Sequence, residues 1–224
     1  MRTAAILPVK RFPLAKQRLR ESVADSLRSD LAKAMVGDVL SALRECTAIE
    51  ATIVVTSESS VALAARYIGA IVVEDSAEEG QSAAVALGLA RASEQGFERG
   101  LCVPGDCPTL DPAELVDLLE GESAALVIVP DRHGKGTNGL LLTPPDAISP
   151  SFGPESRTRH EQLARDGGVS WRIEQPTSLL LDIDTGEDLD VLRERLASTP
   201  TGAPRTRAVL GLGEKSWQNS LPAA

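Results

Sequence analysis

Residues 51–74 read ATIVVTSESSVALAARYIGAIVVE and hold the clearest strand–helix–strand pattern in the chain. Two short runs rich in β-branched residues, Thr52–Val55 and Ala70–Val73, are typical of buried strands. The alanine-rich segment between them is typical of a helix, because alanine has the highest helix propensity. The pattern therefore predicts a βαβ unit, in which the two strands run parallel.

The same alternation continues on both sides of this unit. Apolar residues four apart, from Leu27 to Leu43, predict an amphipathic helix. Asp111-Pro112 and Thr185 give start signals for two later helices, since aspartate and threonine cap helix N-termini and proline favours the first helical position. Further strands are expected at 4–9, 101–103, 124–129, 139–143 and 169–173, and further helices at 82–94 and 160–165.

We therefore predict an α/β fold with a mostly parallel central sheet and helices on both faces. The length of 224 residues suits a single domain over 1–200, followed by a C-terminal tail, 201–224, that is loosely ordered or docked.

The amino-acid composition and the overall charge exclude several classes of function. The formal charge of −9 argues against a nucleic-acid partner, because binding a nucleic-acid backbone needs a basic face. No apolar run is long enough for a membrane span, and the N-terminus has no secretory signal, so we expect a cytoplasmic protein. Three cysteines and two histidines suit neither a disulfide framework nor a zinc site.

A basic loop follows the first strand, in the segment LPVKRFPLAKQRL (7–19). Open α/β sheets place their ligands at the carboxyl ends of strands. Lys10 and Lys16 are therefore candidates for holding the phosphates of a nucleoside triphosphate and stabilising a departing pyrophosphate. A solvated basic loop is the alternative interpretation. The chain has no Walker-type P-loop.

Two other turns are candidates for nucleotide binding. Gly80-Gln81-Ser82 opens a helix, whose N-terminal N–H groups attract phosphate. Pro104-Gly105-Asp106 follows a buried strand. The expected nucleotide-binding set is Pro8, Val9, Lys10, Lys16, Gly80, Gln81, Ser82, Pro104 and Gly105, and the expected catalytic set is Lys10, Lys16 and Asp106.

Carboxylates near the strand ends predict a Mg²⁺ site. Asp106 lies in a stiff loop whose helix-capping role already falls to Asp111, and Asp182 and Asp184 alternate along what we expect to be a strand end, so that both face the same way. Mg²⁺ prefers one or two carboxylates together with substrate oxygens. We predict a metal site of Asp106, Asp182 and Asp184. Which member of the last pair binds the ion stays open, and capping of the final helix is the alternative role for Asp184.

Two polar loops complete the candidate site: GKGTNG (134–139) and SFGPESRTRH (151–160). Glycines, hydroxyls and backbone donors dominate both loops, which suits the binding of a small oxyanion. His133 and His160 are expected to have orienting or structural roles rather than to act as general bases.

Taken together, Pro-Val-Lys with Ala-Lys-x-Arg-Leu, Gly-Asp-x-Pro, Gly-Thr-Asn, the Phe-Gly to Arg-His stretch and Asp-Ile-Asp-Thr resemble the phosphoenolpyruvate/2-phospholactate guanylyltransferase family of coenzyme F-420 biosynthesis. The resemblance runs from about Ala4 to Leu196. It implies a Rossmann-like nucleotidyltransferase fold, GTP as the donor, and a three-carbon phosphoacid held by Thr137, Gly153 and Ser156. Relatives that act on molybdopterin or sugar phosphates usually open with Gly-x-Gly, where this chain has Pro8-Val9-Lys10.

The expected reaction condenses phosphoenolpyruvate with GTP, with Mg²⁺ as cofactor, and these small molecules are the expected partners. Three alternatives stay open: 2-phospho-L-lactate as the acceptor, a CTP or sugar-phosphate transferase of the same fold, and a nucleotide-binding regulatory module without turnover. The sequence is compatible with a homodimer, but it reveals neither the oligomeric state nor the residues that read the guanine base.

Overall fold

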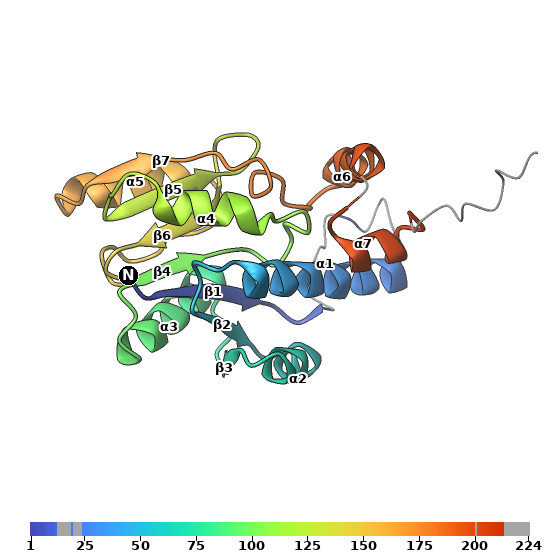
Figure 1. The fold of residues 1–224 in the computed structure, drawn as a ribbon, viewed down its shortest axis with the longest axis horizontal. Coiled ribbons are helices and arrows are strands. Elements are labelled where there is room, and N and C mark those ends of the chain that lie inside the picture. The colour runs from blue at the N-terminus through green and yellow to red at the C-terminus, as the bar shows by residue number, and fades with distance from the viewer. Residues whose placement is uncertain (13–18, 20–23, 200, 213–224) are drawn as a thin grey trace, which may run out of the picture.

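The computed structural model describes residues 1–12, 19, 24–199 and 201–212. In this part of the chain, seven strands form one sheet flanked by helices (Figure 1). The strands are β1 (Thr3–Val9), β2 (Ala51–Thr56), β3 (Ile71–Val73), β4 (Arg99–Cys102), β5 (Leu126–Pro130), β6 (Thr137–Leu142) and β7 (Trp171–Ile173). The helices are α1 (Asp25–Glu45), α2 (Ser59–Tyr67), α3 (Gln81–Glu94), α4 (Pro112–Glu120), α5 (Ser156–Asp166), α6 (Gly186–Ser198) and α7 (Pro204–Val209).

The sheet has the strand order β3-β2-β1-β4-β6-β5-β7. β1 pairs in parallel with β2 and β4, β2 with β3, and β5 with β7, whereas β6 runs antiparallel to β4 and β5. The predicted mostly parallel sheet is confirmed. The chain builds outward from β1 to β3 on one side and then returns to place β4 on the other side of β1. Such a reversal point is where open α/β sheets bind ligands.

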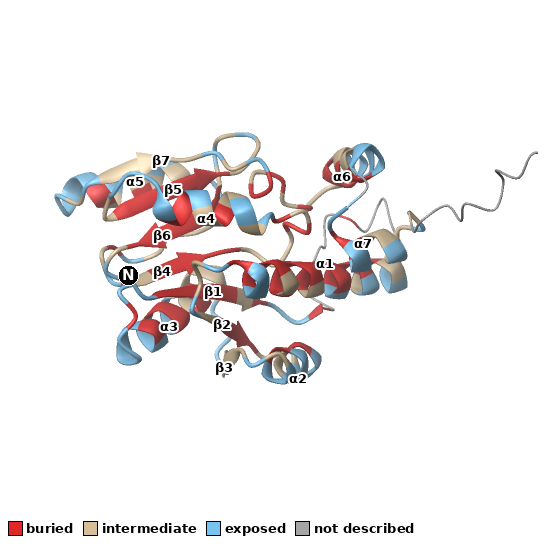
Figure 2. Cartoon of the chain, in the orientation of Figure 1, coloured by how far each residue is buried: buried red, intermediate tan, exposed pale blue. Residues whose placement is uncertain are grey.

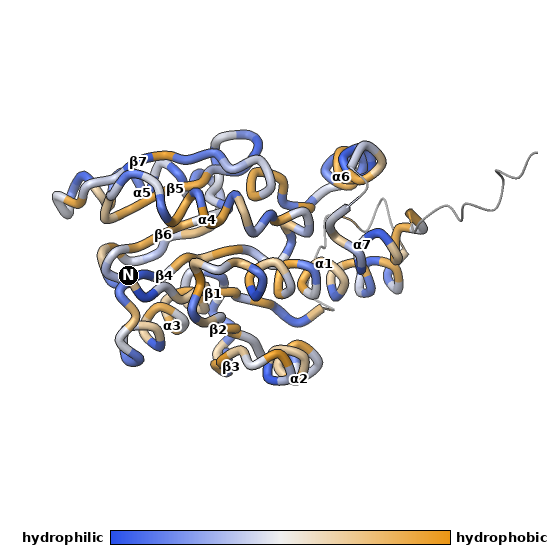
Figure 3. Tube along the Cα trace, in the orientation of Figure 1, coloured by the Kyte–Doolittle hydropathy of each residue, from blue (hydrophilic) through white to orange (hydrophobic). Residues whose placement is uncertain are grey.

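Alternating side chains of the strands build two cores, one on each face of the sheet. One core packs the sheet against α1, α2 and α4, and the other packs it against α3 and α5. Most residues of the central strands are accordingly buried, and hydrophobic residues make up the larger part of them (Figures 2 and 3). Helices on both faces were predicted from the repeated strand–helix pattern, and this prediction is confirmed.

A third, smaller core lies beyond the sheet, where α6 packs near the N-terminal half of α1. Leu31 and Met35 of α1 meet Leu189, Leu192 and Leu196 of α6. In the segment where we expected a tail, the described residues 201–212 include α7, which lies along α1 (Figure 1). The rest of that segment, 213–224, lies outside the described residues.

Both predicted helix starts are confirmed. The Asp111 carboxylate accepts a hydrogen bond from the Ala113 N–H, and Thr185 forms a capping box with Asp188 at the start of α6.

Two expectations about local structure are wrong. α5 begins at Ser156 rather than at 160, preceded by Glu155 in a left-handed conformation that no capping residue announces. Residues 179–184 form no strand; Leu179 and Leu180 end a turn, and the segment that follows is joined to the loop after β4 by the hydrogen bond from the Ile183 N–H to the Asp106 carbonyl. The predicted alternation still holds, because Leu181 and Ile183 are buried and Asp182 and Asp184 are more accessible. None of the described helices is long and apolar enough to cross a membrane.

Candidate active site

A cleft of about 850 Å³ opens at the edge of the sheet where β1 and β4 end. Because β6 runs antiparallel to β4, its first residue, Thr137, lies at the same edge. The loops after β1, β4 and β5, the start of α3 and the start of α5 therefore converge on one space. Residues far apart in the sequence meet there because strand direction brings them to one edge.

Most of the expected site residues line this cleft. They are Pro8, Val9, Lys10, Gly80, Gln81, Pro104, Gly105, Asp106, Thr137, Gly153, Ser156, Asp182 and Asp184. Ser82 does not line the cleft; its hydroxyl accepts a hydrogen bond from the Phe152 N–H at 2.8 Å and so ties α3 to the loop before α5. Lys16 lies outside the described residues.

Three carboxylates line the cleft: Asp106 after β4, and Asp182 and Asp184 before α6. Asp106 and Asp184 are close enough to Asp182 for their charges to affect its pKa. Burial raises the pKa of Asp182 to about 6, and the charges of Asp106 and Asp184 act in the same direction, whereas the hydrogen bond from Asn138 opposes them. The cluster therefore resists carrying all its negative charges without a cation.

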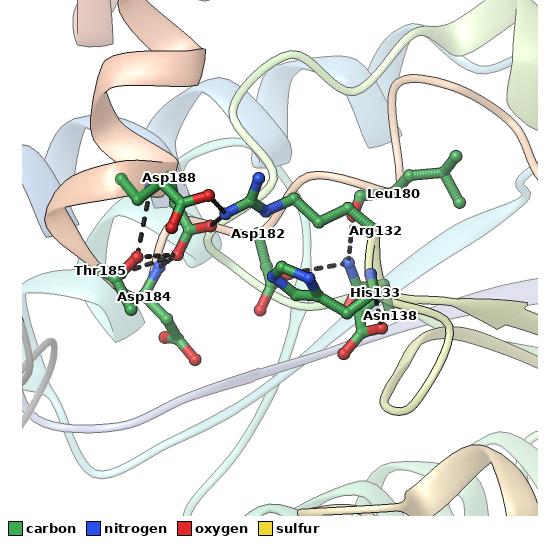
Figure 4. Close-up of polar contacts among 10 residues, drawn as sticks. Arg132, His133, Asn138, Leu180, Asp182, Asp184, Thr185 and Asp188 are labelled. Carbon is green, nitrogen blue, oxygen red and sulfur yellow. Dashed lines mark hydrogen bonds and ion pairs between the residues drawn. The ribbon is translucent and has the colours of Figure 1, made fainter.

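Neighbouring side chains hold the Asp182 carboxylate and the backbone of Asp184 in place (Figure 4). The Asn138 amide nitrogen donates to Asp182 Oδ1 at 3.2 Å and to the Leu179 and Leu180 carbonyls at 3.0 and 3.2 Å. Asp188 Oδ2 accepts from the Asp184 N–H at 3.1 Å and from the Thr185 N–H at 2.7 Å.

Arg132 anchors Asp188 from the other side with an ion pair of 2.8 Å. Asp188 therefore braces the turn before α6, and Asp184 lines the cleft. Capping of the final helix falls to Thr185 rather than to Asp184.

The donor set fits Mg²⁺ better than a metal held by protein alone. Among the described residues, no group of three or more His, Cys, Asp or Glu side chains is placed so that it could hold a metal ion, so Asp106, Asp182 and Asp184 together do not form a protein-only metal site. Mg²⁺ does not require one, because it usually takes one or two carboxylates and fills its octahedral shell with water and substrate phosphate oxygens. Asp106 with Asp182 or Asp184 supplies carboxylates of that kind, beside a space large enough for a nucleotide.

The nucleotide side of the cleft is formed by the basic loop after β1 and by the start of α3. Gly80 precedes α3 with a φ of 107°, which glycine adopts more readily than other residues, and the N-terminus of this helix faces the cleft. Exposed Lys10 lies on the same wall, next to Arg11, whose guanidinium pairs with Glu78 at 2.7 Å.

Another part of the lining, formed by Thr137, Gly153 and Ser156, offers hydroxyl and backbone donors. Thr137 and Ser156 are 7% and 1% exposed, respectively, and Gly153, which has a φ of 113°, also lines the cleft. The Arg159 guanidinium holds the loop before α5 through the Ser151 and Phe152 carbonyls at 3.0 and 3.1 Å. This wall is rigid and can present several donors to a small anion.

Sequence reasoning missed the residues that support the site. Asn138 and Arg132 were given no role, and the contacts of His160 were not foreseen. One signal was available for Asn138, because an amide directly before an apolar strand needs hydrogen-bond partners once it is buried. Nothing in the sequence pairs Arg132 with Asp188, since that contact depends on how the loop after β5 meets the first turn of α6.

The comparisons with known proteins agree with this geometry. The family described as "Guanylyl transferase CofC like" matches residues 3–194. A phosphoenolpyruvate guanylyltransferase from Conexibacter woesei is 48% identical over 213 residues, which cover 94% of this chain and 96% of the relative. A 2-phospho-L-lactate guanylyltransferase from Methanothermobacter thermautotrophicus is 34% identical over 189 residues, covering 84% and 83% of the two chains.

Among solved structures, a nucleotidyl transferase from Methanothermobacter thermautotrophicus superposes with a TM-score of 0.62 at 20% identity, over 88% of this chain and 98% of the other. At that identity the likeness concerns the fold alone, and the fold is that of nucleotidyltransferases.

Proposed function

The chain belongs to the CofC-like guanylyl transferase family, and from this premise we propose that it condenses GTP with phosphoenolpyruvate in coenzyme F-420 biosynthesis. The products are enolpyruvoyl-2-diphospho-5'-guanosine and pyrophosphate. One observation carries the proposal: the lining of a single cleft combines a wall suited to a nucleotide, the carboxylates of Asp106, Asp182 and Asp184, and a wall of hydroxyl donors suited to a small acid.

In the proposed reaction, a phosphate oxygen of the acid attacks the α-phosphorus of GTP. The bond between that phosphorus and the oxygen bridging to the β-phosphate breaks, and pyrophosphate leaves with its electron pair. No general base is needed, because a phosphate monoester with a second pKa of ~6 is mostly dianionic at neutral pH. The tasks of the protein are to align the two substrates and to stabilise the leaving group, for which Lys10 and Lys16 are the candidates.

Mg²⁺ is the proposed cofactor, held by Asp106 with Asp182 or Asp184. When bound, it supplies positive charge that offsets the repulsion between the two substrates. The charge of the cleft supports this proposal. Among the described lining residues, seven carboxylates face only Lys10, Arg11 and Lys135, and the last two cations already pair with Glu78 and Glu155. Such a lining binds two polyanions poorly unless a divalent cation accompanies them.

The alternatives differ in the acceptor and the base. The relative that acts on 2-phospho-L-lactate keeps that acid as the second candidate acceptor. Transfer from CTP or onto a sugar phosphate is disfavoured by the family match. A regulatory module without turnover is disfavoured by the clustered carboxylates, since a nucleotide sensor needs phosphate contacts rather than a metal beside the α-phosphate. We further propose that the protein works in the cytoplasm on small molecules alone, without a nucleic-acid partner, and a homodimer is compatible with this function.

Pyrophosphate release tests the proposed function. Purified protein is incubated with GTP and Mg²⁺, and with phosphoenolpyruvate, 2-phospho-L-lactate or a sugar phosphate in parallel reactions. We expect release with phosphoenolpyruvate and none when either the acid or Mg²⁺ is left out. Equal release with CTP in place of GTP, or with the sugar phosphate as acceptor, would falsify the proposal.

A second measurement tests which wall of the cleft binds the acid and which binds the nucleotide. Ser156→Ala removes one hydroxyl from the acid side, so the KM for the acid should rise about ten- to a hundredfold, as expected for losing a hydrogen bond to a charged group. The KM for GTP should stay near the wild-type value. If the KM for GTP rises as much as that for the acid, this wall holds the nucleotide instead.

A further inference from the structure

His160 lies in α5 behind the acid side of the cleft and is fully buried, with 0% exposure. Its two ring nitrogens each contact a different part of that wall. Nε2 lies 2.9 Å from the Ser151 backbone nitrogen, and Nδ1 lies 3.0 Å from the Thr137 hydroxyl. The edge-on Phe152 ring, 5.2 Å away between centroids, covers the imidazole. The residue therefore links β6 to the loop that carries Gly153.

These contacts define where the imidazole carries its proton. A backbone N–H can only donate, so Nε2 must accept from Ser151 and cannot be protonated. The ring is therefore neutral, with its single proton on Nδ1. Burial, and then the nearby charge of Arg159, lower the pKa of His160 to about 4, which agrees with a neutral ring at physiological pH.

The proton on Nδ1 in turn defines what the Thr137 hydroxyl can do. Nδ1–H must donate to Oγ1, and this contact uses one lone pair of the hydroxyl oxygen. The hydroxyl keeps its own proton and cannot donate it back to His160. Within the described part of the chain, His160 is the hydrogen-bond partner found for this hydroxyl, and Thr137 lines the cleft. The hydroxyl proton is thus available to a ligand there.

We propose that His160 is a positioning residue that makes the Thr137 hydroxyl an obligate hydrogen-bond donor toward a carboxylate or phosphate oxygen of the acid acceptor. The inference rests on the proposed function, since it assigns the ligand of Thr137 to the acid. His160 does not itself line the cleft, so it acts through Thr137. Without this contact the hydroxyl can rotate and present its lone pairs, which repel an oxyanion.

Two substitutions at His160 separate its two hydrogen bonds. In His160→Asn, the amide nitrogen occupies about the place of Nδ1 and can still donate to Thr137. In His160→Gln, the amide oxygen reaches about the place of Nε2 and can accept from Ser151, but the donor to Thr137 is lost. We expect the KM for phosphoenolpyruvate to rise about ten- to a hundredfold in His160→Gln and to stay close to wild type in His160→Asn, with the KM for GTP unchanged in both.

A purely structural role predicts a different result. Both variants would then lower the melting temperature and impair both substrates alike, and that outcome overturns the proposal. The Thr137→Val background sharpens the comparison, because valine keeps the shape of threonine without its hydroxyl. Adding His160→Gln to Thr137→Val should raise the KM for the acid no further, whereas multiplied effects would place the role of His160 elsewhere.

Nitrogen NMR of histidine-labelled wild-type protein tests the tautomer without any need for turnover. The chain has only two histidines, so a His133→Gln variant, which changes an exposed side chain, assigns the signals. A neutral ring protonated at Nδ1 supports the proposal, and a proton on Nε2 overturns it whatever the kinetic variants show. A wild-type protein with the expected tautomer but no pyrophosphate release from GTP and either acid would instead refute the proposed function.

Discussion

Asp106 joins two parts of the site that are distant in the sequence. Its side chain faces the cleft from the loop after β4, while its carbonyl oxygen accepts the hydrogen bond from the Ile183 N–H and so fixes the segment that carries Asp182 and Asp184. The backbone contact does not depend on the carboxylate. Charge at this position can therefore be changed with little effect on the way the two segments meet.

Asp106→Asn should consequently fold normally and lose activity at least roughly a hundredfold, the size of effect seen when one group that stabilises transition-state charge is removed. Part of the activity should return at high Mg²⁺ concentration. Asp111→Asn is the matched control, since it makes the same change in the same loop at a helix cap where asparagine serves equally well. Wild-type turnover of Asp106→Asn at limiting Mg²⁺ would exclude the metal role.

His160 should also make the free energy of unfolding depend on pH. Its pKa is about 4 in the folded protein and about 6.5 in an unfolded chain. As the pH falls from about 6.5 to about 4, the imidazole of His160 is protonated in the unfolded state but stays neutral in the folded state, so the unfolded state becomes relatively more stable. The contribution is complete above pH 6.5 and is lost toward pH 4, by an amount on the order of 3 kcal/mol.

Urea denaturation of the wild type and of His160→Asn between pH 7.5 and 4.5 measures this contribution. The wild type should lose more stability than the variant as the pH falls, because the amide does not titrate. Parallel curves for the two proteins would show that His160 is not kept neutral by its surroundings.

α7 illustrates how an element with little hydrophobic surface is held in place. This helix of six residues packs on α1, and the Asp38 carboxylate accepts hydrogen bonds from the Arg205 and Thr206 N–H groups at 3.1 and 2.8 Å. Asp38 is 4% exposed, so these donors satisfy a buried carboxylate. The helix start in turn gains a negative charge, which its dipole favours.

Asp38→Ala should therefore lower the free energy of unfolding by about 1.5–3 kcal/mol, because two helix N–H groups lose a charged acceptor. Asp30→Ala changes an exposed aspartate of the same helix and should have a far smaller effect. Chemical denaturation of both variants against the wild type gives the comparison. Equal stability of all three proteins would mean that α7 docks without the help of Asp38.

At the scale of the whole molecule, the cleft combines a strongly acidic lining with the task of holding anionic substrates. The protein as a whole has a formal charge of −9, and the described residues that line the cleft also carry a net negative charge. Nucleotide binding should for this reason depend on Mg²⁺. The dependence is a property of the assembled cleft rather than of any one side chain.

Thermal unfolding tests this dependence in the absence of the acid. With Mg²⁺ and GTP at about a hundred times the dissociation constant, the melting temperature should rise by roughly 5–10 °C, which corresponds to about 2.7 kcal/mol for a protein of this size. The same GTP concentration with a chelator should give less than half of that rise. The Asp106→Asn variant serves as the control and should lose the Mg²⁺-dependent part. An equal rise with and without Mg²⁺ would show that the protein alone holds the triphosphate.

The sequence by itself determined the fold class and most of the site. Short β-branched runs between helical patterns imply a mostly parallel sheet, because each type of element has its own hydrophobic period. Strand ends then identify where a ligand binds, and this rule places Lys10, Gly80 and Asp106 at one edge of the sheet. These conclusions depend on local spacing and on a general rule of topology, and both can be read from a linear chain. Thr137 reaches the same edge only because β6 runs antiparallel to β4, which the structure decided.

Only the tertiary structure decided which side chains support that site. The contacts of Asn138 with Asp182, of Arg132 with Asp188 and of His160 with Thr137 join segments whose separation in the sequence carries no periodic signal. The same holds for residues 179–184, which have the alternation of a strand but find no neighbouring strand to pair with. Hydrogen bonds are directional and short, so these pairings depend on where packing of the cores brings each backbone, and local sequence does not encode that position.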